Sequence, residues 1–155
     1  DLDGDGRLEA VGAGSGVFAA DAHSGRLLWA VKSGYDITAG GDVVVGAGRT
    51  WASVVVADID ADGVLEVISA HASGTVSVYT PSGVFKPGWP RVVTPDLVEG
   101  SAGESDGQPA FLHAATAPEL RGLMVADVAG DVRLEVVVTA SGSARNPWVF
   151  RHDGS

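Results

Sequence analysis

The 155-residue chain contains no cysteine, so neither disulfide bonds nor thiol chemistry contribute to it. Small secreted animal modules usually rely on disulfides, and the absence of cysteine therefore favours a bacterial protein. Basic residues are also few: 10 Lys and Arg against 20 Asp and Glu give a net charge of −10. The basic residues form no stripe, so a nucleic-acid partner is not expected. No apolar run reaches the length of a membrane span, and none is expected.

Sustained helical periodicity and catalytic motifs are missing as well. With 22 glycines and only short valine and alanine runs, the composition predicts many short strands joined by tight turns. No Gly-x-Ser-x-Gly element is present, and no histidine pair has a zinc-binding spacing. We therefore interpret the four histidines as surface or turn residues and expect no enzyme activity from this chain: they are His23, His71, His113 and His152.

The chain does contain a repeated acidic segment. Residues 1–11 read DLDGDGRLEAV, residues 58–68 read DIDADGVLEVI, and residues 127–137 read DVAGDVRLEVV. The copies start 57 and 69 residues apart, which indicates a repeat architecture. Carboxylates at alternate positions around a glycine form an oxygen cage for a hard cation. Eleven of the 20 acidic residues lie in these copies, so they account for most of the acidity.

The spacing of the acids excludes an EF-hand. An EF-hand loop needs its bidentate acid at position 12, where this chain has Gly12 and Ser69. The last acid instead stands at position 9. β-Branched runs typical of strands flank the second loop at 53–57 and 66–70, and the third at 123–126 and 135–139. The unit is therefore predicted to be a β-hairpin with a cation at its tip.

This unit resembles the FG-GAP/VCBS repeat, in which each repeat is one four-stranded blade of a β-propeller and a D-x-D-x-D-G-x-x-[DE] loop binds calcium. The resemblance covers about residues 1–31, 50–92 and 120–154 and implies Ca²⁺ as the cofactor. It implies side-chain ligands from Asp1, Asp3, Asp5 and Glu9 with the carbonyl of Arg7, and from Asp58, Asp60, Asp62 and Glu66 with the carbonyl of Val64.

The third copy departs from the pattern, although Asp127, Asp131 and Glu135 keep three of its acids. Position 3 is Ala129, which has no side-chain oxygen. Position 6 is Val132, where the other copies have glycine, and a β-branched residue at positive φ is disfavoured by about 1–2 kcal/mol. We expect a weak cation site there, or none.

The expected fold is all-β: a β-propeller fragment of about two and a half four-stranded blades with calcium-binding hairpin loops. The predicted units are a blade lacking its first strand at 1–33, an inter-blade linker at 34–49, and a complete blade at 50–92. An inter-blade insert loop at 93–119 and a blade lacking its last strand at 120–155 follow. Both ends would leave strand edges unpaired, so we expect the segment to associate.

Tryptophans in the outer strands have two interpretations. Trp29 and Trp89 either fill space between neighbouring sheets or line a ligand pocket. The stretch from Ala20 to Trp29 is also similar to a blade-packing pattern of quinoprotein dehydrogenases, with Ser24 where threonine is usual. The 93–119 insert is either a partner-binding loop or a variation in length, and it is expected on the face opposite the acidic loops.

These observations favour a calcium-stabilised β-propeller module for binding, adhesion or scaffolding, in an extracellular or cell-surface protein. Extracellular calcium is high enough to fill sites of modest affinity. The expected partners are a protein or carbohydrate ligand and the remaining blades of the same chain. The alternative is the propeller domain of a secreted carbohydrate-active enzyme or a lectin.

Overall fold

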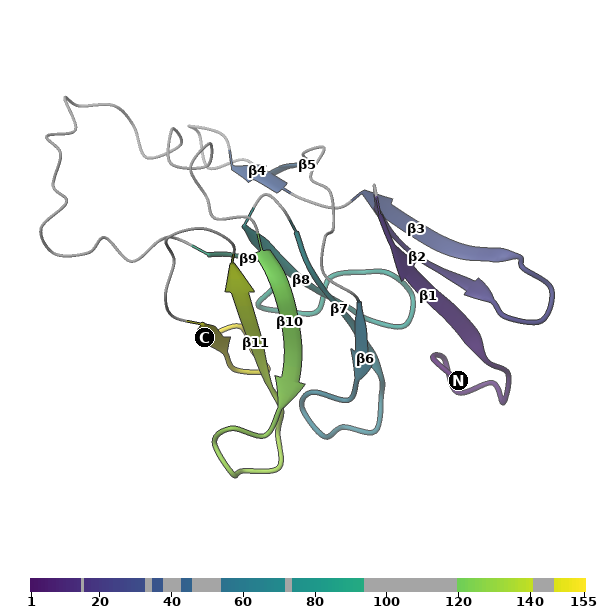
Figure 1. Cartoon of the computed structure of the whole chain (residues 1–155). Coiled ribbons are helices and arrows are strands. Elements are labelled where there is room, and N and C mark those ends of the chain that lie inside the picture. The colour runs from purple at the N-terminus through teal and green to yellow at the C-terminus, as the bar shows by residue number, and fades with distance from the viewer. Residues whose placement is uncertain are drawn as a thin grey trace, which may run out of the picture.

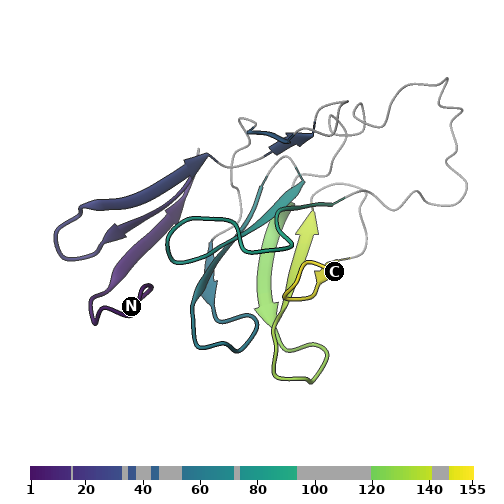
Figure 2. The same cartoon turned by 180° about the vertical axis from the view of Figure 1, so that it is seen from behind.

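Antiparallel strands make up the fold of this computed structural model, which describes residues 1–14, 16–32, 35–37, 43–45, 54–71, 74–93, 120–140 and 147–155 (Figures 1 and 2). These residues form strands and turns without a helix, as the composition predicts. Within the same ranges, no helix is long and apolar enough to cross a membrane.

The described residues form four sheets, and the three larger ones follow one another along the chain. The first sheet has the order β1 (Glu9–Ala13), β2 (Gly16–Asp21) and β3 (Leu27–Lys32). The second sheet has the order β6 (Val55–Ala57), β7 (Glu66–Ala70), β8 (Thr75–Tyr79) and β9 (Arg91–Val92). The third sheet has the order β10 (Leu120–Ala126), β11 (Glu135–Ala140) and β12 (Trp148–Phe150).

The three sheets fall within the ranges 1–33, 50–92 and 120–155, and their strands number three, four and three. The segment predicted as a linker at 34–49 also contains strand: β4 (Tyr35–Ile37) pairs with β5 (Val43–Val45). The insert predicted at 93–119 lies outside the described residues, except for Val93. Its expected face and the helix or strand considered for it therefore remain predictions.

The second sheet is the centre of the fold because it packs on both sides. Alternate residues of a strand point to opposite faces. On one face, Val67 and Tyr79 pack in a cluster with Val17 and Ala19 of the first sheet. On the other face, residues of β7 and β8 share a buried cluster with the third sheet: Ile68, Ala70, Val76, Val78, Leu120, Val136 and Val138. Apolar side chains on both faces of the second sheet thus contact a neighbouring sheet.

Tryptophans join each sheet to the next by the same contact. The indole N–H of Trp29 in the first sheet donates to the carbonyl of Pro81, in the turn after β8, at 2.7 Å. The indole N–H of Trp89 donates to the carbonyl of His152, in the turn after β12, at 3.0 Å. The first interpretation is therefore confirmed for both residues: they pack between sheets.

Trp89 itself lies outside the outer strand in which it was expected. Strand β9 begins two residues later, at Arg91. Pro87 and Pro90 lack the amide N–H that a strand ladder requires, which explains the late start. The pattern around Trp29 is preserved, because the Ser24 hydroxyl donates to Asp21 Oδ1 at 2.7 Å, as a threonine at this position could also do.

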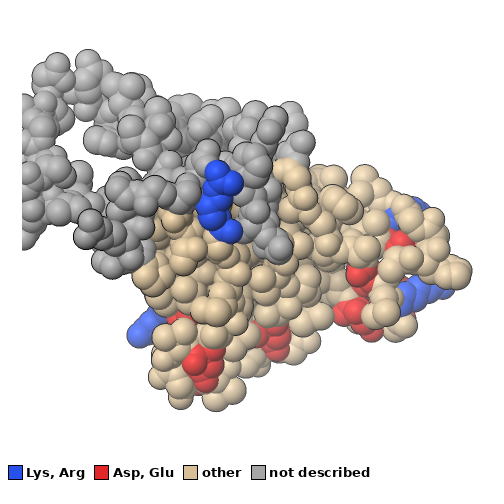
Figure 3. Space-filling view, viewed as in Figure 1, with Lys and Arg blue, Asp and Glu red and all other residues tan. Residues whose placement is uncertain are grey.

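The stacking of the sheets brings the acidic loops to one edge. The loop preceding β1, the β6–β7 loop and the β10–β11 loop all lie at the lower edge in Figure 1, and acidic side chains gather there in Figure 3. Position 2 anchors the first two loops between sheets, since Leu2 and Ile59 are buried in the contacts there. The amide of Leu134 donates to the carbonyl of Ile59 at 2.9 Å, which ties the third sheet to the second loop.

Candidate metal centre

The first loop gathers three carboxylates at one point. Asp1, Asp3 and Asp5 are exposed, and each offers an oxygen such that these oxygens all lie within 4.8 Å of one another. Backbone amides shape the loop around them: Gly6 N–H donates to Asp1 Oδ2 at 3.0 Å, and Arg7 N–H donates to Asp5 Oδ1 at 2.8 Å. The acids at positions 1, 3 and 5, singled out by the sequence, are therefore brought together.

The second loop repeats this arrangement with Asp58, Asp60 and Asp62, again with oxygens within 4.8 Å of one another. Gly63 N–H donates to Asp58 Oδ2 at 2.8 Å, and Val64 N–H donates to Asp62 Oδ1 at 2.8 Å. These are the bonds of the first loop at equivalent positions. The two copies therefore have the same local geometry, as their sequences predict.

The loop backbone has positive φ at two positions, of which the sequence predicted only position 6. Position 6 has φ of 85° at Gly6 and 86° at Gly63, as expected for glycine. Position 4 also lies in this region, with φ of 79° at Gly4 and 61° at Ala61. The signal for position 4 is the glycine that copies one and three share there, which the alanine of copy two obscured.

The third loop keeps the turn although its sequence has changed. Asp127 accepts hydrogen bonds from the amides of Gly130, Asp131 and Val132. Val132 adopts φ of 78°, the strained conformation that its β-branched side chain disfavours. With Ala129 at position 3, however, the loop lacks one of the three carboxylates. The third copy thus keeps the loop backbone of the repeat but not its full set of metal-binding groups.

The glutamate at position 9 has one role that all three loops share. Its Oε2 accepts the amide N–H of position 2: Leu2 to Glu9, Ile59 to Glu66 and Val128 to Glu135. This bond closes the base of the loop where the following strand begins. The clusters within 4.8 Å contain aspartates only, so the glutamates brace the loops, and their predicted role as cation ligands stays a prediction.

Sequence reasoning missed Lys86, the one cation placed inside a loop cluster among the described residues. Its Nζ lies 2.8 Å from Asp60 Oδ2 and 2.8 Å from Glu66 Oε1, and its side chain is only 13% exposed. Burial acts to lower the pKa of Lys86, but the two carboxylates outweigh it and hold the pKa above its ordinary value. No local pattern pointed to this contact, because 20 residues separate Lys86 from Glu66.

His71 was interpreted as a surface or turn residue: it does lie in the turn between β7 and β8, where its amide donates to the Thr75 carbonyl at 2.9 Å, but it is not at the surface. Its side chain is fully buried, with its Nε2 3.0 Å from the Ser69 hydroxyl and 3.2 Å from the Ser77 hydroxyl. Burial lowers the pKa of His71 to about 4. The imidazole is therefore neutral at pH 7. Its buried position leaves this Ser–His group without access to a substrate.

The donor set of the second loop fits a hard divalent cation such as calcium. Asp60 Oδ1 is buried and has no hydrogen-bond partner, although Asp60 Oδ2 is paired with Lys86. A buried carboxylate oxygen without a partner is costly, and a cation beside it would remove that cost. Three aspartate oxygens are the ligand type that calcium prefers over softer metals. The first loop offers the same oxygens in a more exposed setting.

Comparison with known protein families agrees with this geometry. The family model described as FG-GAP-like repeat matches residues 1–69, which span the first sheet and reach β7 with the whole second loop. Searches of curated proteins and of solved structures gave no significant match. The two complete acidic loops both fall inside the matched range. Residues 1–69 of this chain are therefore similar to an FG-GAP-like repeat.

Proposed function

We propose that this chain is part of a β-propeller module whose acidic loops bind calcium and so stiffen one edge, in a protein that binds a partner outside the cell. The observation that carries the proposal is the pair of aspartate clusters, each with oxygens within 4.8 Å, at equivalent positions of two successive sheets. Three negative charges at this spacing repel one another unless a cation lies among them.

The fold supports a scaffolding role for the cation. Each cluster lies in a loop that leads into a strand of its sheet, the edge strand β1 or the inner strand β7. Position 2 of the same loop, Leu2 or Ile59, is buried in the contact with the following sheet. A cation that orders the loop therefore also orders the contact between sheets. A blade edge held in this way is a rigid platform on which neighbouring loops can bind a partner.

Calcium suits this role better than zinc or magnesium. Zinc favours nitrogen and sulfur ligands, and the clusters contain only carboxylates. Magnesium demands near-ideal octahedral geometry, whereas calcium tolerates a flexible set of oxygen ligands. Loops of this kind in extracellular modules bind calcium with Kd values of about 10⁻⁴–10⁻³ M, a range that extracellular calcium can saturate.

Isothermal titration calorimetry with CaCl₂ and with ZnCl₂ tests the proposal. We expect heat from calcium and weak or no binding of zinc. Asp3→Asn should remove binding at the first loop and Asp60→Asn at the second, because each loses one charge while keeping a side-chain oxygen. Asp131→Asn is the matched control in the third loop and should leave calcium binding unchanged. If titration of the wild-type chain with CaCl₂ gives no heat of binding, the proposal is overturned.

Thermal unfolding offers a second readout of the same binding. Calcium that binds only the folded chain stabilises it by RT ln(1 + [L]/Kd), about 2.7 kcal/mol at a hundredfold excess over Kd. The melting temperature of the wild-type chain and of Asp131→Asn should therefore rise with calcium concentration. Asp60→Asn should lose much of that rise. Equal responses of Asp60→Asn and Asp131→Asn would contradict the assignment of the sites.

A further inference from the structure

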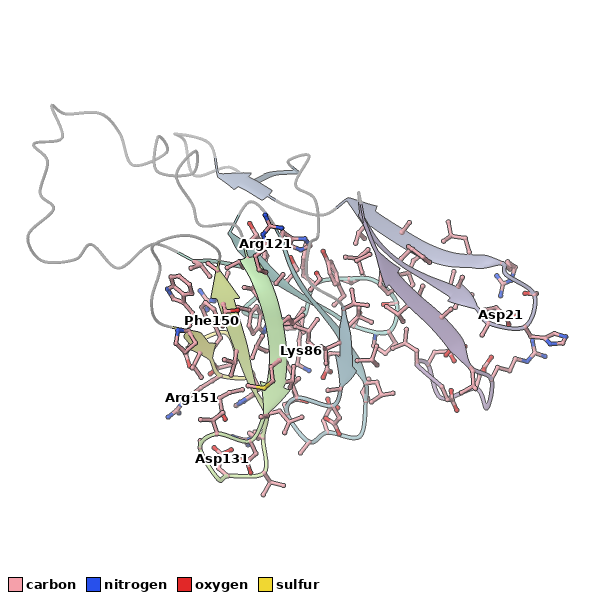
Figure 4. The ribbon with its side chains drawn as sticks, viewed as in Figure 1. Asp21, Lys86, Arg121, Asp131, Phe150 and Arg151 are labelled. Carbon is pink, nitrogen blue, oxygen red and sulfur yellow. The ribbon has the colours of Figure 1, made fainter. Side chains whose placement is uncertain are left out.

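Lys86 distinguishes the second acidic loop from the first. Its ammonium group bridges Asp60 Oδ2 and Glu66 Oε1 at 2.8 Å each. Asp60 and Glu66 occupy positions 3 and 9 of the loop. Figure 4 shows Lys86 within the body of the molecule, whereas Asp131 of the third loop lies near its tip. The second loop thus has its own positive charge, supplied by the connection between β8 and β9.

The first loop lacks this charge. Phe85 pairs with Tyr79 in the second sheet, and Leu27 pairs with Ala20 at the matching position of the first sheet. The residue that corresponds to Lys86 is therefore Leu28, which is apolar. Within the described ranges, no ammonium or guanidinium group lies at ion-pair distance from the carboxylates of the first loop. Arg7 of the first loop is also positively charged but makes no ion pair with these acids, so among the described residues only the second loop has a cation paired directly with its carboxylates.

We infer that Lys86 is a resident cation that makes the second loop the weaker of the two divalent-cation sites and holds that loop in shape when no metal is bound. This inference rests on the proposed calcium binding. Lys86 is a positioning residue in this account: it fixes Asp60 Oδ2 and Glu66 Oε1. The first loop, with four carboxylates and no such partner, is the site of higher affinity.

Elementary electrostatics sets the direction and size of the effect. A positive charge that pairs with a ligand carboxylate repels a divalent cation bound to the same carboxylate. Even with the screening of bulk water, a unit charge and a divalent ion a few ångströms apart repel enough to lower affinity by about tenfold. Screening is weaker here, because the Lys86 side chain is 13% exposed and that of Glu66 is 2% exposed. Removing the ammonium should therefore strengthen cation binding at the second loop.

Calorimetry in a background without the first site isolates the second loop. In Asp3→Asn, calcium binding reports the second loop alone, and adding Lys86→Met should raise its affinity by about tenfold or more. Arg26→Met is the matched control, since it also removes one positive charge but from an exposed turn of the first sheet. It should change affinity by less than about twofold, through long-range charge alone. Where Lys86→Met folds poorly, Lys86→Gln keeps N–H donors without the charge and carries the same expectation.

The outcomes separate this inference from the proposed function. Unchanged or weaker binding on adding Lys86→Met, in a chain whose wild type binds calcium, overturns the role of Lys86 and leaves calcium binding intact. Absence of binding in the wild type and every variant overturns both. A metal-free readout is also available: in chelator, Lys86→Met should melt at a lower temperature than Arg26→Met. Equal melting temperatures there would refute the claim that Lys86 holds the loop in shape.

Discussion

Replacing Trp89 with phenylalanine tests the contact that stacks the second sheet on the third. The indole N–H of Trp89 donates to the carbonyl of His152 at 3.0 Å, and the ring is 6% exposed in the shared core. Its centroid lies 5.9 Å from that of Phe150, edge to face. Trp89→Phe removes the donor and part of the ring, while leaving an aromatic side chain in place.

The expected cost follows from these contacts. Losing a hydrogen bond and leaving its buried carbonyl partner unpaired costs about 1 kcal/mol. The smaller ring weakens the aromatic pair with Phe150, which contributes about 0.5–1.5 kcal/mol beyond area burial. We therefore expect Trp89→Phe to lower the free energy of unfolding by about 2 kcal/mol. Trp89→Ala, which also opens a cavity, should cost about 3–5 kcal/mol.

Urea unfolding followed by far-UV circular dichroism measures this loss without relying on tryptophan emission. With an m-value of about 2 kcal/mol/M, Trp89→Phe should shift the midpoint down by about 1 M. Trp29→Phe is a matched comparison: it breaks the equivalent bond to Pro81, but Trp29 is only half-buried, so its loss should be smaller. If Trp89→Phe unfolds at the wild-type midpoint, the indole contact does not hold the sheets together and the reasoning fails.

Three further substitutions test the backbone and the buried histidine. Val132→Gly should raise the free energy of unfolding in urea by up to about 1 kcal/mol, because it relieves the backbone strain of a β-branched residue at φ 78°. A lower free energy of unfolding in this variant would contradict the presence of strain. Gly88→Ala should destabilise by about 3 kcal/mol or more, since its Cβ would clash with the Asp153 carbonyl oxygen. Gly25→Ala is the comparison: it has open space around its Cβ and should cost about 1 kcal/mol. Burial lowers the pKa of His71 to about 4, so between that pH and 6.5 the unfolded chain binds a proton that the folded chain does not. Stability should therefore fall by about 2 kcal/mol from pH 7 to pH 5 relative to His71→Gln, and parallel pH profiles would refute this.

Much of the local structure could be predicted from the sequence because it depends on neighbouring residues. The strands after the second and third acidic loops were expected from their β-branched runs and are present as β7 and β11. Carboxylates at positions 1, 3 and 5 converge because a loop of this length curls around them, whatever lies beyond it. The match of residues 1–69 to an FG-GAP-like repeat confirms the resemblance stated from these residues. Whether the sheets close into a propeller stays a prediction.

The missed positive φ at position 4 and the late start of β9 have local causes, whereas other features that the sequence did not predict depend on the tertiary structure. His71 is isolated from the other histidines in sequence, and only the folded structure buries it. The sequence predicts Trp89 within a strand, but its indole N–H instead donates a hydrogen bond to the carbonyl of His152, 63 residues away.

The acidic pattern by itself therefore determined where a cation could bind, because alternate carboxylates and a turn with positive φ are encoded within nine residues. Only the tertiary structure decided how the two loops differ. Lys86 reaches Asp60 and Glu66 because the β8–β9 connection folds back beside the loop, so that a charge from 20 residues downstream of Glu66 enters the cluster. Electrostatic energy depends on distance in space, and the order of residues along the chain does not reveal that distance.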